Sequence, residues 1–158
     1  MTLEMKSFKI AFAIIIVIST ALLFPLINLM IDGPVAVAPD ALLGKTPLFQ
    51  KAAPVIQVSC LNCHSYRTQL PWYASLPLAQ KLIQRDIEDA RGAVDFEKEL
   101  FTPNQAPAKK TLVKMKAEIR DGAMPPIEYK ALHWKAVLSS KEKQAILDWI
   151  AEQQSLRS

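Results

Sequence analysis

Both cysteines of this chain and one of its two histidines lie within five positions, in the stretch "SCLNCH" at 59–64. No other feature restricts the fold as much, because three side chains that bind metals or form covalent bonds must share one site. Three chemistries use such residues: a structural zinc ion, a redox-active disulfide and a covalently attached haem. The residues around the motif discriminate among them.

Zinc and disulfide chemistry both fit this stretch poorly. A structural zinc site needs four ligands, and the fourth would be His133, while the adjacent Cys63 and His64 would strain one tetrahedral centre. A redox-active cysteine pair usually opens a helix in a strand–helix–strand setting. No strand pattern surrounds Cys60, so neither interpretation is favoured.

Covalent haem attachment uses all three residues at this spacing. Two cysteines three positions apart on a helical turn can add to the two vinyl groups of a haem, and the following histidine can bind the iron. The motif therefore predicts one covalently attached haem c. Cys60 and Cys63 would form the thioethers, and His64 would be the proximal iron ligand.

Residues 10–31 form a second constraint, because they run for 22 positions without a charge. As a helix they would be about 33 Å long, which matches the hydrocarbon thickness of a bilayer. A cleaved signal peptide is the alternative, with "AVA" at 36–38 as its cleavage site. The run is longer than a signal core, and Pro39 would follow the cut, so an uncleaved single-pass anchor is favoured.

Lys6 and Lys9 precede the apolar run and predict a cytoplasmic N-terminus. The rest of the chain would then lie on the periplasmic side of a bacterial inner membrane, where c-type haem is attached. The net charge of +4 is modest, and no dense basic run suggests a nucleic-acid partner.

The expected organisation has three parts: an anchor at 1–31, an extended tether at 32–49 rich in Pro, Gly, Ala and Val, and a haem domain at 50–158. Helical spacing predicts helices that open near Pro54, run from Leu76 to Gly92, span 108–121 and start after Ser139 with a capping box. No stretch reads as a strand. The fold class is therefore predicted to be all-α, with an N-terminal transmembrane helix followed by a small helical domain around the haem.

The loop before the last helix resembles the closing section of small cytochromes c, in which a methionine is the sixth iron ligand. The resemblance implies Met124 as the distal ligand, and Pro125 and Pro126 would stiffen its loop and remove two amide donors. His133, nine positions later, is the alternative distal ligand.

Four stretches occur in the order found in the haem-binding domain family of cytochrome-c-like proteins: "CLNCHS", "LPWYASLP", "MPPIEYKALH" and "LSSKEKQAILDWI". The resemblance covers about residues 52–152, and Leu70 stands where the family has a tryptophan. It implies a cytochrome-c-like domain. The aromatic residues in these stretches would contact the haem or its propionates, or would be ordinary core residues; they are Trp72, Tyr73, Tyr129 and Trp134.

Together these features predict a membrane-anchored carrier of single electrons between redox partner proteins, alone or as a subunit of a larger membrane redox complex. It would not be an enzyme, although weak peroxidase-like activity stays open. The alternative is a haem sensor or ligand-binding protein whose sixth iron position is labile or vacant.

Overall fold

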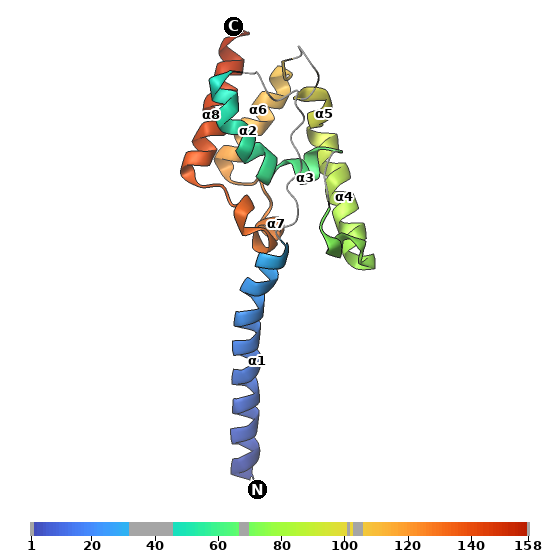
Figure 1. The fold of residues 1–158 in the computed structure, drawn as a ribbon, viewed down its shortest axis with the longest axis vertical. Coiled ribbons are helices and arrows are strands. Elements are labelled where there is room, and N and C mark those ends of the chain that lie inside the picture. The colour runs from blue at the N-terminus through green and yellow to red at the C-terminus, as the bar shows by residue number, and fades with distance from the viewer. Residues whose placement is uncertain (1, 32–45, 67–69, 101, 103–105, 158) are drawn as a thin grey trace.

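The computed structural model describes residues 2–31, 46–66, 70–100, 102 and 106–157. Within these ranges every regular element is a helix and no strand occurs, which confirms the predicted all-α class. The elements are α1 (Thr2–Ile31), α2 (Pro47–Ser59), α3 (Leu61–His64), η2 (Trp72–Ser75), α4 (Pro77–Ala93), α5 (Phe96–Glu99), α6 (Lys109–Asp121), α7 (Ile127–Leu132), η3 (Trp134–Ala136) and α8 (Ser140–Ser155). Figure 1 shows that the elements from α2 to α8 form one helical body and that α1 projects from one end of it.

α1 contains the uncharged run and is a single helix throughout. Large apolar side chains are exposed along it, among them Phe8, Ile15 and Leu22. In the part of the chain that the structure describes, no helix reaches the length and apolarity needed to cross a membrane. The predicted membrane crossing is therefore not confirmed.

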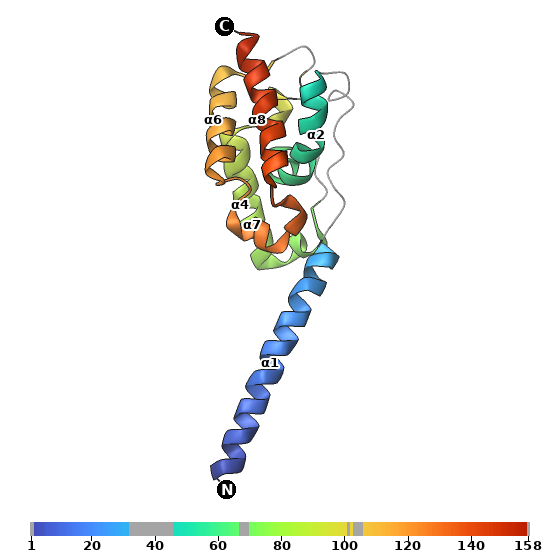
Figure 2. The same ribbon diagram turned by 90° about the vertical axis from the view of Figure 1, so that its left-hand side faces the viewer.

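α2 and α8 lie side by side in the helical body (Figure 2). Their main contact joins Phe49 and Trp149, whose rings meet edge to face with 5.2 Å between centroids. Both side chains are about 1% exposed, and such an aromatic pair adds about 0.5–1.5 kcal/mol beyond the burial of its area. Trp149 therefore lies in the core of the helical body.

α2 begins one full turn and more before the predicted start at Pro54. Thr46 caps the helix, because its side-chain oxygen accepts a hydrogen bond from the main-chain N–H of Phe49 at 3.3 Å. Pro47 then occupies the first turn, where its missing N–H has no cost. The last residues of the predicted tether, 47–49, are thus helical, while residues 32–45 lie outside the described part of the chain.

Two helices follow the sequence prediction closely. The helix predicted at 108–121 is α6, and Gly122 ends it with φ of 70°, a conformation that costs glycine little. α8 opens with the predicted capping box, in which Ser139 and Glu142 each satisfy the other's main-chain N–H.

α4 is helical as predicted, but its apolar face does not belong to the core. No residue of α4 is buried, and Leu82 is 50% exposed. Leu82 and Ala90 instead line a pocket that α4 shares with α3 and the segment before α7. Part of the apolar face of α4 therefore lines a pocket and not the core.

Candidate haem site

The Cys-x-x-Cys-His motif lies at the junction of α2 and α3. Cys60 separates the two helices, and its carbonyl oxygen accepts hydrogen bonds from the main-chain N–H groups of Cys63 at 3.2 Å and His64 at 3.1 Å. This tight turn directs all three side chains into one pocket. The structure thus brings together the three residues that the motif predicts to act together.

The His64 imidazole is held in one orientation. Its Nδ1 lies 2.9 Å from the main-chain carbonyl oxygen of Val94, and its ring stacks on Phe96 with 5.0 Å between centroids. A carbonyl only accepts, so Nδ1 carries the proton and Nε2 keeps its lone pair. Burial lowers the pKa of His64, which favours the neutral ring that a metal needs.

The segment that supplies the Val94 carbonyl is fixed by polar contacts. Asp95 caps α5 by accepting a hydrogen bond from the main-chain N–H of Glu97 at 3.1 Å, and Arg91 approaches the same carboxylate at 3.3 Å. Glu97 in turn accepts a hydrogen bond from the hydroxyl of Ser65 at 2.5 Å, next to His64. These hydrogen bonds therefore fix the position of the Val94 segment relative to His64.

Cys60 and Cys63 are not joined by a disulfide. Burial raises the pKa of Cys60 to about 12 and that of Cys63 to about 11. Nearby negative charge is the second cause, from Cys63 for Cys60 and from Asp86 for Cys63. Both groups are protonated near neutral pH, whereas a redox-active pair needs a thiolate. No group of three or more His, Cys, Asp or Glu is arranged to hold a bare metal ion in the described ranges, so zinc gains no support.

The pocket beside the motif has a volume of about 570 Å³. That size falls within the range of about 300–1,000 Å³ typical of cofactor pockets. Three segments line it: the motif, α4, and the stretch from Met124 to Tyr129. Met124 is half-buried in this lining, so the sequence-predicted distal residue and the attachment motif share one cavity.

The donor set in this pocket fits a haem. Two protonated thiols, an imidazole with Nε2 available and a thioether are the groups that a c-type haem with a histidine and a methionine ligand requires. Leu82, Ala90 and Ala93 supply apolar surface, while charged side chains stand exposed where they border the pocket; these are Arg85, Asp86, Asp89 and Glu128.

His133 does not line this pocket. It is buried, its Nε2 lies 2.6 Å from the hydroxyl oxygen of Tyr73, and its ring stacks on Tyr129 at 4.1 Å between centroids. Burial also raises the pKa of Tyr73 to about 12, so that its hydroxyl is the proton donor in this pair. The distal role of His133 stays a prediction, but here the ring is engaged elsewhere.

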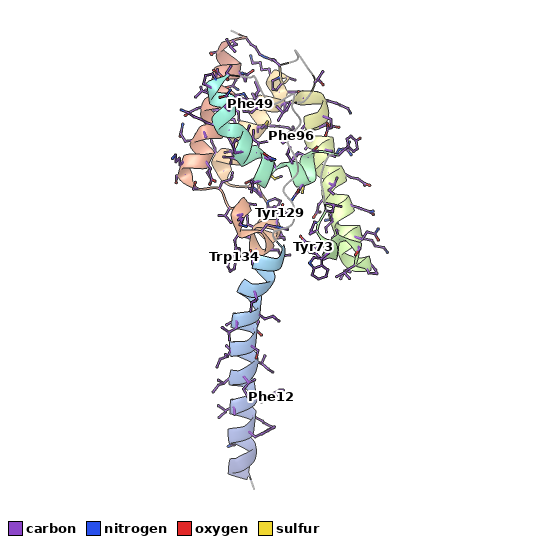
Figure 3. All side chains as sticks on the ribbon, viewed as in Figure 1. Phe12, Phe49, Tyr73, Phe96, Tyr129 and Trp134 are labelled. Carbon is purple, nitrogen blue, oxygen red and sulfur yellow. The ribbon has the colours of Figure 1, made fainter. Side chains whose placement is uncertain are left out.

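The predicted aromatic contacts divide into two groups. Tyr129 lines the pocket, whereas Trp72 is 64% exposed and does not line it. Figure 3 shows Tyr73, Tyr129 and Trp134 together at the end of the body where α1 joins it.

Two contributors to the site were absent from the sequence prediction. Asn62 lies inside the motif, and its Nδ2 donates a hydrogen bond to the hydroxyl of Tyr129 at 2.8 Å. Its position between the two cysteines was the only available signal. The contribution of Val94 is a main-chain carbonyl, which no side-chain pattern could have indicated.

Comparison with known proteins agrees with this geometry. The model of the Haem-binding domain family matches residues 25–152, which include every residue of the pocket. The chain is also 31% identical over 98 residues to the cytochrome c peroxidase Ccp of Escherichia coli strain K12. That match covers 61% of this chain and 21% of the relative, so the chain spans about a fifth of that protein's length.

No solved structure matches the chain. The family match extends over most of the sequence and takes in both the Cys-x-x-Cys-His motif and the Met124 segment. The chain therefore belongs to the haem-binding domain family, as its motifs predicted.

Proposed function

We propose that this protein carries single electrons on one covalently attached haem c. The observation that supports this most directly is the shared pocket, in which Cys60, Cys63, His64 and Met124 all take part in the lining. His64 and Met124 would both be ligands of the iron, and the iron would then have no position left for a substrate. When bound, the haem supplies one-electron exchange at its edge.

Each residue has a distinct part in this proposal. The thiols of Cys60 and Cys63 would hold the haem through two thioether bonds. His64 offers Nε2 to the iron because Val94 occupies Nδ1. Met124 offers its thioether from the other end of the lining, and this soft neutral ligand raises the reduction potential. The exposed charges of Asp86 and Glu128 border the pocket, where a partner would approach the haem edge.

The proposal includes attachment to a membrane through α1, with the haem domain on the periplasmic side of a bacterial inner membrane. Support comes from the uncharged run at 10–31, from Lys6 and Lys9 before it, and from the exposed apolar side chains of α1. Electron donors and acceptors would be redox proteins, separate or in a common membrane complex.

A second candidate is a haem whose sixth position opens to a small ligand or peroxide. One observation favours it: the relative in Escherichia coli is a cytochrome c peroxidase. Because the match covers about a fifth of that protein, an electron-delivering domain within a larger peroxidase would explain the similarity equally well.

The absorption spectrum of the full-length protein, produced with the haem-attachment machinery, tests the proposal. We expect a low-spin ferric spectrum with the near-infrared charge-transfer band of iron bound to a thioether. A haem lost on acid–acetone extraction would contradict covalent attachment, and high-spin ferric iron would favour the second candidate. Low-spin iron without the thioether band would assign the distal position to His133.

A further inference from the structure

Exposed apolar side chains gather at the end of the helical body from which α1 projects. Outside α1, the described residues include twelve exposed large apolar side chains, and half of them belong to the two short segments 72–78 and 127–134. Segment 72–78 contains η2 and the start of α4, and segment 127–134 contains α7 and the start of η3. Both segments lie at this end in both views (Figures 1 and 2). We call them the apolar end face: Trp72, Leu76, Leu78, Ile127, Leu132 and Trp134.

These side chains are separate from the candidate haem pocket. None of the six is among the described residues that line it. Single exposed apolar residues are common on soluble proteins, but a cluster of this kind marks a contact surface.

The end of α1 is fastened to this face by one buried side chain. Asn28 is 4% exposed, its Nδ2 donates a hydrogen bond to the carbonyl oxygen of Ala131 at 3.1 Å, and its Oδ1 accepts one from the N–H of Trp134 at 3.2 Å. Both ends of the amide are therefore paired with main-chain groups of the α7–η3 segment. The end of α1 and the α7–η3 part of the apolar end face are therefore held together.

The exposed apolar surface continues from the end face onto α1. Leu22 and Leu26, within the last turns before the junction, are 64% and 56% exposed. Trp72 and Trp134 are 64% and 47% exposed, and tryptophan is enriched where a membrane meets water, since its ring is apolar and its N–H is polar. Lys135, exposed beside Trp134, adds a charge that suits anionic lipid.

We propose that the apolar end face rests on the lipid surface into which α1 inserts, with the two tryptophans among the headgroups. This inference rests on the membrane attachment proposed above. Its consequence is a fixed orientation of the haem pocket, because Met124 and its neighbours lead directly into α7. The domain then meets its redox partners at a constant height above the membrane.

The test uses nitroxide labels on three single-cysteine variants of the haem-loaded full chain, in which Cys60 and Cys63 hold the haem. Leu78→Cys reports on the end face, where the side chain is 75% exposed. Leu156→Cys, at a residue 70% exposed near the opposite end of the body, is the matched control. Ile15→Cys reports on α1, where the side chain is 59% exposed. The proteins are placed in vesicles of phosphatidylcholine and phosphatidylglycerol.

Collision of each nitroxide with oxygen, which concentrates in lipid, is compared with collision with a water-soluble nickel chelate. We expect the ratio of oxygen to nickel collisions to be severalfold higher at positions 15 and 78 than at 156. A lipid signal at 15 with a water signal at 78 would overturn the inference and leave the membrane attachment standing. A water signal at 15 would overturn both. Broadening at 78 that grows with the protein-to-lipid ratio would mean that a second copy covers the face, which also overturns the inference.

Discussion

The Nδ1 atom of His64 lies 2.9 Å from the carbonyl oxygen of Val94, a residue 30 positions further along the chain. This one contact determines which imidazole atom can bind iron. A hydrogen bond from one ring nitrogen fixes the ring and raises the basicity of the other nitrogen, so Val94 would act on a bound iron without touching it. The orientation depends on how α4 ends and α5 begins, far from the motif in sequence.

We expect His64→Gly to keep the haem attached through Cys60 and Cys63 while the iron loses its proximal ligand. The ferric spectrum should become high-spin, and added imidazole should restore the low-spin form by entering the space that the side chain leaves. His133→Gln is the control, since its ring pairs with Tyr73 outside the pocket, and its spectrum should stay low-spin. Unchanged low-spin iron in His64→Gly would exclude His64 as a ligand.

Met124→Ala should open the sixth iron position to added ligands. A bound thioether competes with cyanide or imidazole, so its removal should raise their affinity by about tenfold or more, equivalent to about 1.4 kcal/mol. The reduction potential should fall because the soft ligand is lost. Met115→Ala, at a half-buried residue that packs against the core, is the control. Equal cyanide affinity in the two variants would contradict the distal role of Met124.

The sequence predicted those parts of the molecule that depend on local rules. The helix over 108–121 and the capping box at Ser139 require only a few neighbouring residues, and the Cys-x-x-Cys-His motif is contained within five positions. Met124 was found through resemblance, which places a residue in an order along the chain.

The missing parts depend on contacts between distant segments. Periodicity did not predict that the apolar face of α4 lines a pocket and is not buried in the core, because the same spacing of apolar residues occurs in both cases. The start of α2 was missed because Thr46 and Pro47 lie in a stretch whose composition suggests a tether. The docking of Asn28 against α7 spans more than a hundred positions and has no local signature.

Asn62 and Tyr129 should be energetically coupled, because their hydrogen bond of 2.8 Å joins the attachment motif to the segment that follows Met124. A double-mutant cycle with Asn62→Ala and Tyr129→Phe measures this coupling in urea unfolding of the haem-loaded protein. We expect about 0.5–1.5 kcal/mol, the usual net value of a neutral hydrogen bond. If the losses of unfolding free energy in the two single variants add up to the loss in the double variant, the hydrogen bond contributes nothing. In each variant, the charge-transfer band of iron bound to a thioether reports whether Met124 has moved.

Ser139→Ala should lower the free energy of unfolding by about 1 kcal/mol, because the side chain accepts a hydrogen bond from the main-chain N–H of Glu142 at 3.3 Å and caps α8. Ser140→Ala changes the same side chain one position later, at the first helical residue, where it caps nothing. Its effect should stay within about 0.5 kcal/mol. Equal losses in both variants would contradict a capping role.

Glu142 should make the stability of the domain depend on pH. Its Oε2 accepts hydrogen bonds from the hydroxyl of Ser139 at 2.6 Å and from the N–H of Ser139 at 2.8 Å, and these lower the pKa of the carboxyl below 4.5. The folded state then binds this proton less readily than the unfolded state. The stabilisation is complete above pH 4.5 and is lost as the pH falls through the lowered pKa.

Urea unfolding measures this dependence. At pH 7 the free energy of unfolding of Glu142→Gln should be clearly lower than that of the parent, and near pH 3 the two values should be nearly equal. Glu88→Gln, at an exposed residue within α4 that caps no helix, should show no such convergence. A gap between Glu142→Gln and the parent that stays constant over this range would mean that the carboxylate charge does not stabilise the cap.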